Sequence, residues 1–232
     1  MKKLVVFSGA GISAESGIHT FRDADGLWEQ QRIEDVATPE AWARDPARVQ
    51  RFYNERRRQI LAAQPNLAHQ LVAQLQDHFA VQVISQNIDD LHERAGSTQV
   101  LHLHGNIRLA KSAAPDAQYS TTFYPIEGWQ LDIEKDFAAD GYPLRPHVGW
   151  FGEAVPAYEQ ALHWVQDADI FIVIGSSLAV YPVAGLIHHI PPHCQAYVID
   201  PKADQIDLPA HFQCLNMPAT TGMQWLLQHL LR

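Results

Sequence analysis

The sequence carries two kinds of hydrophobic pattern: short apolar runs, and longer stretches with one apolar face. The runs are rich in β-branched residues and predict buried strands at Lys2 to Phe7, Val81 to Ile84, Ile170 to Ile174, Ala196 to Ile199 and, more weakly, Phe212 to Leu215. The longer stretches predict helices at Asp45 to Ala63, Leu67 to His78, Pro156 to Gln166, Tyr181 to His189 and Gly222 to Leu231. This alternation predicts an α/β fold with a doubly wound parallel sheet of Rossmann-like type.

Two segments interrupt the alternation, Asp23 to Ala63 and Asn106 to Leu144. The stretch from Phe21 to Val36, which leads into the first segment, has no strand-like run and is expected to be a long loop. We therefore expect one domain over 1–232, with a large lobe formed by 1–22, 64–105 and 145–232 and a small lobe inserted at 23–63 and 106–144. The cleft between the lobes, beyond the C-terminal strand ends, is where a ligand is expected.

Composition narrows the class of protein. The 232 residues are 47% hydrophobic and 19% charged, as in a soluble globular protein, and no apolar run reaches the length of about 18 residues that a membrane helix needs. A formal net charge of -9 argues against a general nucleic-acid binder, because phosphate neutralisation needs a basic surface. The two cysteines, Cys194 and Cys214, demand no disulfide framework, so a cytoplasmic location is expected.

A glycine turn follows the first predicted strand as G-x-G-x-x-A, from Gly9 to Ala14. Gly9 can take backbone angles closed to other residues, Gly11 lets the main chain approach a pyrophosphate, and Ala14 is small enough for close helix packing. The next helix is expected to offer its N–H groups to an anion. On spacing alone, an ordinary tight βα turn explains the pattern as well. The acidic second strand of a simple dehydrogenase is missing, which argues against that class.

Polar residues cluster where later strands end. Gln86, Asn87 and Asp89 follow one strand, where they suit either a polar ligand or the cap of the next helix. If VLHLHG is extended, His102 and His104 point the same way, and His104 suits a general base, although a lone histidine is more often structural.

Three further segments complete the set of candidate motifs. RPHVGWFGE, from Arg145, offers either an edge for an extended peptide or an ordinary packed aromatic turn. GSSLAVYP, from Gly175, supplies a small hydroxyl-bearing turn, and Asp200 and Pro201 place a carboxylate where a ribose hydroxyl could be held.

Together these motifs resemble those of the sirtuin (Sir2) family of NAD-dependent protein-lysine deacylases, whose NAD-binding fold is also that of deoxyhypusine synthase. The likeness spans nearly the whole chain. It is carried by GAGISAESGIHTFR from Gly9, QNID from Gln86, HLHG from His102, RPHVGWFGE and GSSLAVYP.

The resemblance implies that NAD is the co-substrate and that the acyl-lysine oxygen attacks the ribose carbon as nicotinamide leaves. His104, Asn87 and Asp89 would be catalytic, with His104 as general base on a ribose hydroxyl and the other two beside the carboxamide. The products would be free lysine, nicotinamide and O-acyl-ADP-ribose. NAD would bind across Gly9, Ala10, Gly11, Ser13, Ala14, Phe21, Arg22, Gln86, Asn87, Ile88, Asp89, Gly175, Ser176, Ser177, Val180, Asp200, Pro201 and Ala219. The substrate peptide would bind along Val148, Gly149, Trp150 and Phe151.

The chain departs from the family in one respect. Sirtuins usually carry four cysteines that hold a structural zinc, and this chain has none between His104 and His147, so no zinc or other metal is expected. We expect an apolar cluster to stabilise the small lobe instead, formed by Tyr119, Phe123, Tyr124, Trp129 and Phe137.

The helix predicted from Asp45 carries a clue to the acyl group. Tyr53 and Arg56 lie on its inward stripe with Val49 and Ile60, where Arg56 needs an anion, either an internal carboxylate or a ligand. Arg57 and Arg58 lie off the stripe and are expected to be solvated. Tyr53 and Arg56 also match the Y-x-x-R pair of the desuccinylase-like branch (class III), which grips an acyl carboxylate, so the resemblance implies both acetyl and succinyl removal.

Two other functions share these residues: a sirtuin-like NAD hydrolase or ADP-ribosyltransferase, and an NAD sensor without turnover. Deacylation is favoured by His104, Tyr53 and Arg56. The expected partners are acylated lysines of proteins, without nucleic acid or membrane, and the expected state is a monomer.

Overall fold

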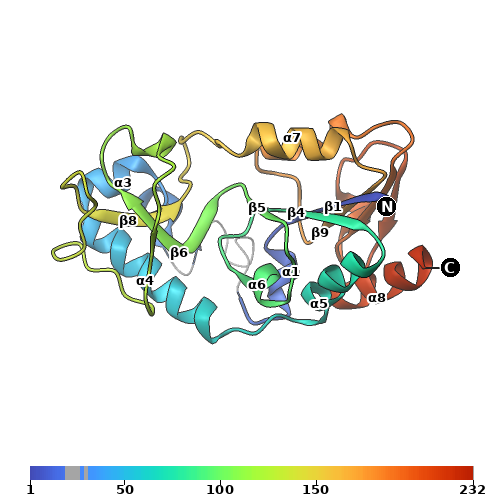
Figure 1. Ribbon diagram of the computed structural model, residues 1–232, viewed down its shortest axis with the longest axis horizontal. Coiled ribbons are helices and arrows are strands. Elements are labelled where there is room, and N and C mark those ends of the chain that lie inside the picture. The colour runs from blue at the N-terminus through green and yellow to red at the C-terminus, as the bar shows by residue number, and fades with distance from the viewer. Residues whose placement is uncertain (19–26, 29–30, 232) are drawn as a thin grey trace.

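The computed structural model describes residues 1–18, 27–28 and 31–231. The predicted NAD contacts Phe21 and Arg22 lie outside these residues. The main sheet has six parallel strands in the order β11-β10-β9-β1-β4-β5 (Figure 1). Their bounds are β1 Lys3–Ser8, β4 Ala80–Ser85, β5 Val100–His102, β9 Ile170–Ile174, β10 Gln195–Ile199 and β11 Phe212–Leu215. The predicted fold class is confirmed, because the apolar runs form parallel strands.

Both faces of this sheet are covered, which is why its strands do not alternate in polarity. Leu4 and Val6 of β1 pack with α5 (Leu67–Gln74) and α8 (Ala219–Leu230). Val5 and Phe7 pack on the other side with α7 (Tyr158–Gln166) and η3 (Val183–His189). The helix predicted at 181–189 forms as a 3-10 helix, η3, over Val183–His189. Short 3-10 turns also occur at η1 Leu75–Asp77, η2 Ala117–Tyr119 and η4 Ala203–Gln205. Within the described residues, no helix is long and apolar enough to cross a membrane.

A second, antiparallel sheet in the order β7-β6-β8 lies at the other end of the molecule, beside α3 and α4 (Figure 1). Its strands are β6 Gly105–Ser112, β7 Tyr124–Pro125 and β8 Leu144–Val148, and the nearby elements are β2 Leu27–Trp28, β3 Gln31–Arg32, α2 Ile33–Val36, α3 Pro39–Arg44 and α4 Pro46–Ala62. The long loop predicted up to Val36 is thus wrong for its second half, where β3 and α2 form. Asp45 caps α4 as its sequence suggests, accepting a hydrogen bond from Arg48 N at 2.9 Å.

The interior of this second unit differs from the predicted aromatic cluster. Its apolar residues are Ala110, Ile126, Leu131, Ala138 and Leu144, and of the five predicted aromatics only Tyr124 packs against them. Tyr119, Phe123, Trp129 and Phe137 are exposed. Aliphatic side chains form this interior, and four of the five predicted rings lie at the surface instead.

Arg57 ties this unit to α4. It was expected to be solvated, but its side chain is fully buried. Its guanidinium donates to Ile107 O at 2.7 Å, Trp129 O at 2.8 Å and Asn54 Oδ1 at 2.8 Å. Asn54 in turn bonds both the N–H and the C=O of Leu131. These polar contacts hold Ile107 of β6 and the segment 129–131 against α4. Arg58, as expected, is exposed and pairs with Glu55.

Candidate active site

The glycine turn lies at the point where the strand order reverses, since β1 has β9 on one side and β4 on the other. Gly9 N donates to Ile174 O at 3.0 Å and Gly11 N to Gly175 O at 2.8 Å. A Cβ on Gly11 would lie 2.6 Å from Gly175 Cα, and one on Gly9 would lie 2.7 Å from Gly175 O. These glycines are required by backbone packing against Gly175. Gly9 is not among the residues with positive φ, so the left-handed angles that a glycine can take are not used here.

The helix after the glycine turn does not offer the free N–H groups that were expected to bind an anion. α1 (Gly11–Ala14) is a single turn, and the N–H groups of Ile12 and Ser13 bond within it, to Gly9 O and Ala10 O at 3.1 Å each. With Gly11 N bonded to Gly175 O, these three donors are occupied inside the protein. An anion bound here would therefore depend on other donors.

Asn87, Asp89 and Ser13 form the polar centre of this end of the sheet. Asn87 Nδ2 donates to Gly9 O and Ser13 Oγ at 3.2 Å each, and Ser13 Oγ donates to Asp89 Oδ2 at 2.9 Å. All three side chains are buried. Burial raises the pKa of Asp89, although hydrogen bonds from Leu91 N and Ser13 oppose the rise. The capping alternative also holds in part, since Asp89 Oδ1 accepts Leu91 N at 3.2 Å near the start of α6 (Leu91–Arg94).

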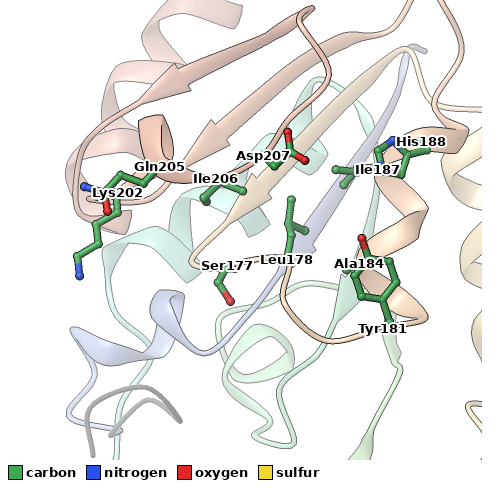
Figure 2. A pocket seen from close by; sticks show the side chains of 10 residues that line it. All are labelled: Ser177, Leu178, Tyr181, Ala184, Ile187, His188, Lys202, Gln205, Ile206 and Asp207. Carbon is green, nitrogen blue, oxygen red and sulfur yellow. The ribbon is translucent and has the colours of Figure 1, made fainter. Parts of the chain in front are cut away.

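The turn after β9 joins this centre. Ser176 Oγ donates to Gln86 Oε1 at 2.7 Å, and Gly175 N donates to Ile199 O at 2.9 Å, directly before Asp200. Asp200 itself accepts Lys202 N at 2.9 Å, Pro201 is exposed, and Ala219 begins α8. Val180 packs on the sheet with η3. A cavity of about 400 Å³ opens beside Ser177 and Leu178, with Tyr181 and His188 on one side and Lys202 and Gln205 across it (Figure 2).

His104 lies at the other side of the centre. β5 ends at His102 and Leu103 and His104 form a turn, so the extended alternation predicted for the two histidines is wrong beyond His102. His104 O accepts Gly149 N at 2.9 Å. Burial lowers the pKa of His104, so its imidazole is neutral at pH 7 and able to accept a proton.

The predicted peptide segment adjoins the predicted acyl site. Val148 and Trp150 share a hydrophobic cluster with Tyr53 and Ile88. Gly149 N, Trp150 N and Phe151 N already donate to His104 O, Glu153 Oε2 and Ala37 O. A peptide paired along this edge would have to use the carbonyls of these residues.

Tyr53 and Arg56 are buried on α4, as the periodicity predicts. Burial raises the pKa of Tyr53. A hydrogen bond with Trp150 opposes this rise, as do the nearby charges of Arg145 and Arg56. Arg56 reaches a cavity of about 440 Å³ that is also lined by Arg48 and Arg51 and by one carboxylate, Glu55, which pairs with Arg58. Positive charge therefore predominates around this cavity.

A buried chain of polar side chains beneath the centre was missed from the sequence. Ser8 and Ser85, which end β1 and β4, are 3.2 Å apart at their hydroxyls, and His92 Nε2 lies 3.0 Å from Ser8 Oγ. Ser85 Oγ also accepts Asn87 N at 3.1 Å. The ring of His69 packs edge-on against His92 at 5.0 Å. In the sequence, the one sign of this chain is that a serine, Ser8 or Ser85, ends each of two apolar runs.

Among residues 1–18, 27–28 and 31–231, no group of three or more histidine, cysteine or acidic side chains could hold a metal ion. The absence of zinc from this protein stays a prediction.

Comparison with known proteins identifies the class. The Sir2 family model matches residues 9–182, so the chain belongs to the Sir2 family. It is 48% identical over 232 residues to an NAD-dependent protein deacylase of Bacteroides thetaiotaomicron, covering 100% of this chain and 99% of the relative. A second NAD-dependent protein deacylase, from Helicobacter pylori, is 48% identical over 233 residues, with 100% and 98% covered.

Solved structures agree with this assignment. A Sir2 homologue in complex with NAD superposes with a TM-score of 0.85 at 37% identity, covering 99% of this chain and 90% of that one. A Sir2–p53 peptide–NAD complex gives 0.77 at 30% identity, with 97% and 92% covered. The folds therefore match over nearly their full length.

Proposed function

We propose that this protein is an NAD-dependent protein-lysine deacylase that removes acetyl and succinyl groups, giving nicotinamide, O-acyl-ADP-ribose and free lysine. The observation that carries the proposal is the buried centre of Asn87, Asp89 and Ser13 beside the Gly9–Gly175 contact, with His104 against Gly149. The names of the relatives and the NAD and peptide complexes among the structural neighbours support it.

The donor set suits NAD. An amide and a carboxylate, buried where the strand order reverses, match a ligand that carries a carboxamide and ribose hydroxyls. When bound, NAD supplies the ribose carbon whose bond to nicotinamide is broken. Asn87 and Asp89 would hold the carboxamide end, and Gln86, Ser176, Ser177 and Asp200 would lie toward the adenosine end.

His104 would act as the base. Its lowered pKa keeps one ring nitrogen available as an acceptor at pH 7, and its contact with Gly149 sets it next to the segment proposed to carry the substrate lysine. Val148, Trp150 and Tyr53 would exclude water from that lysine, because they belong to one apolar cluster.

The test is to incubate the protein with NAD and an acetyl-lysine or succinyl-lysine peptide and to follow peptide mass and nicotinamide. Peptide-dependent release of nicotinamide with loss of the acyl mass supports deacylation. Release without peptide supports the hydrolase alternative, and no release supports an NAD sensor. His104→Ala should abolish deacylation, and full retained activity would refute its role.

The acyl preference is proposed from Arg56, which is buried on the same helix as Tyr53 and opens on a cavity with two other arginines. Guanidinium groups bind carboxylates well, so this wall suits a succinyl group. Arg56→Met should lower desuccinylation by roughly tenfold or more while deacetylation falls less. Arg58→Met, on the exposed side of α4, is the matched control. An equal fall in both activities for Arg56→Met would exclude the carboxylate role.

We also propose a cytoplasmic monomer that acts on acylated proteins and binds neither nucleic acid nor membrane. Its elution volume in size-exclusion chromatography, compared with that of a 26.1 kDa globular standard, tests the monomer.

A further inference from the structure

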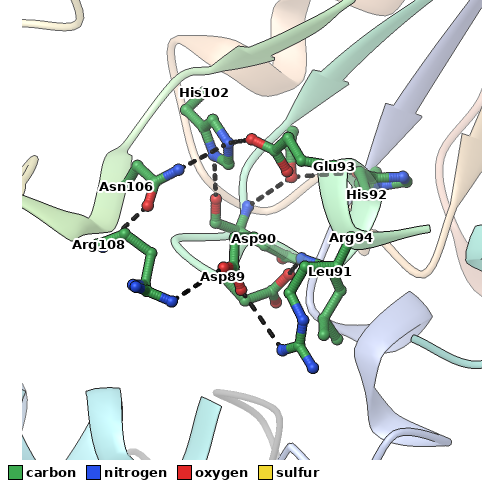
Figure 3. A network of polar contacts seen from close by, with 12 residues as sticks. Asp89, Asp90, Leu91, His92, Glu93, Arg94, His102, Asn106 and Arg108 are labelled. Carbon is green, nitrogen blue, oxygen red and sulfur yellow. Dashed lines mark hydrogen bonds and ion pairs between the residues drawn. The ribbon is translucent and has the colours of Figure 1, made fainter. Parts of the chain in front are cut away.

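His102 contacts two hydrogen-bond acceptors, one at each ring nitrogen. Nδ1 lies 3.0 Å from the carbonyl oxygen of Asn87, and Nε2 lies 2.6 Å from Glu93 Oε1 (Figure 3). A neutral imidazole has only one N–H, so it can donate to one of these oxygens. Only the doubly protonated ring satisfies both, and the geometry therefore points to an imidazolium held by a carboxylate.

Asn106 does not change this assignment. Its Oδ1 is the acceptor for Arg108 N at 2.9 Å, so the group 3.3 Å from His102 Nε2 is its donor Nδ2. Beside a protonated Nε2 this contact is not a hydrogen bond, and the shorter contact of 2.6 Å with Glu93 takes the ring proton. Burial alone would lower the pKa of His102, but the contacts with Glu93, Asn87 and Asp89 raise it above its ordinary value. Burial opposes ionisation of Glu93, and the hydrogen bond from His102 lowers the pKa of that carboxyl.

We propose that His102, charged and anchored by Glu93, is a positioning residue that fixes the backbone of Asn87 and favours the ionised form of Asp89. This role of His102 rests on the proposed function, in which Asn87 and Asp89 hold the nicotinamide end of NAD. Residues 87–89 belong to the short link between β4 and α6. The carbonyl of Asn87 is held by His102, while the side chains of Asn87 and Asp89 face Gly9 and Ser13. The charge of His102 lowers the pKa of Asp89 against the effect of burial.

The charged and titratable groups around His102 come from several elements. They are His92 and Glu93 of α6, Asp89 and Asp90 of the preceding link, Arg108 of β6, His104 of the following turn and His147 of β8. Burial holds the pKa values of His92, His104 and His147 below the ordinary histidine value. These three histidines are therefore neutral where His102 loses its proton. Burial also lowers the pKa of Lys111 of β6 to about 8, so the part of the basic limb that moves in Glu93→Gln, and not the presence of a limb, reports His102.

The experiment measures nicotinamide exchange and kcat/KM for NAD from pH 6 to 9 in wild type, Glu93→Gln, His102→Asn and His102→Ala. Wild type should lose activity as the pH rises through the raised pKa of His102. Glu93→Gln keeps a hydrogen-bonding group but removes the anion, so its basic limb should move about one pH unit lower. His102→Ala should lower kcat/KM by about 10- to 100-fold. His102→Asn, which keeps a donor at the place of Nδ1, should recover part of that loss and show no basic limb from this residue.

Two measurements keep the test decisive. Histidine ring NMR titration of wild type and Glu93→Gln reports the pKa of His102 directly, and NAD titration calorimetry reports binding without turnover. An unchanged pH profile in Glu93→Gln, or a His102 that titrates at or below its ordinary pKa, would overturn the proposal even in an active enzyme. If wild type shows no exchange at all, the proposed function fails instead. Should His102→Ala not fold, Glu93→Gln carries the test alone.

Discussion

Arg57→Met is the sharpest test of how the region around β6 and β7 is held together. The guanidinium donates three hydrogen bonds of 2.7 to 2.8 Å to Ile107 O, Asn54 Oδ1 and Trp129 O. Hydrogen bonds from a charged donor contribute roughly 1.5–3 kcal/mol each. Burial of the charge opposes this stabilisation. It lowers the pKa of Arg57 from 12.5 to about 10, which corresponds to a cost of about 3 kcal/mol for keeping the guanidinium charged.

The three bonds outweigh that cost. Methionine would fill part of the space but would leave the carbonyls of Ile107 and Trp129 without this donor. We expect the free energy of unfolding to fall by about 2–4 kcal/mol. Arg57→Lys should lose nearly as much, because an ammonium group cannot reproduce the planar fork.

The assay is urea unfolding of the purified protein at pH 7.5, followed by circular dichroism, with Arg58→Met as control. Arg58 neighbours Arg57 on α4 but is exposed and pairs only with Glu55 among the described side chains, so its replacement should leave the urea midpoint unchanged. The reasoning is refuted if Arg57→Met and Arg58→Met unfold at the same urea concentration.

Four further predictions concern the sheet and its centre. Gly11→Ala places a Cβ 2.6 Å from Gly175 Cα and should destabilise the protein by about 1–3 kcal/mol or more. Gly185→Ala is the control, because the nearest neighbour of its Cβ is Tyr181 Cε1 at 4.0 Å. Equal melting temperatures of the two variants would contradict this prediction. Burial lowers the pKa of His69 to about 4, so the stability it contributes is full above pH 6.5 and falls as the pH drops toward 4. His69→Leu should therefore remove about 2 kcal/mol of the loss between pH 7.5 and pH 5, and an unaltered pH dependence of unfolding would count against it. Ser13→Ala removes the hydroxyl that joins Asn87 and Asp89 and should weaken NAD binding about 5- to 10-fold in calorimetry, with unchanged affinity as the contrary result. Because burial lowers the pKa of His104, deacylation should hold its rate as the pH falls through 6.5, and an acid limb at or above that pH would argue against His104 as the base.

The main sheet could be predicted from the sequence because its strands are uninterrupted apolar runs, and β9 and β11 begin and end as predicted. The clustering of Asn87 and Asp89 with the glycine turn followed from the rule that parallel strands end at one edge. Arg57 could not be predicted, since its acceptors are backbone carbonyls at Ile107 and Trp129, far along the chain. Helical spacing gives the side of a helix on which a residue lies, but it does not show which loop covers that side.

The same limit applies to His102. The sequence shows two histidines with one residue between them, and only the end of β5 at His102 separates their surroundings. His102 contacts Glu93 of α6, whereas His104 lies beside Gly149. A strand end of this kind depends on tertiary packing, so the division of the HLHG motif appears only in three dimensions.

Ile88 separates the two polar residues of the centre, and its own side chain points the other way. It packs in the cluster of Val148, Trp150 and Tyr53, while its carbonyl accepts Ile107 N at 2.9 Å. Three consecutive residues thus belong to two different environments. In a genetic screen, a variant damaged at Ile88 should therefore be rescued by compensating changes among the apolar neighbours on α4 and β8, far from the glycine turn in sequence. Suppressor mutations of that kind would trace the contact between the two halves of the molecule without any ligand.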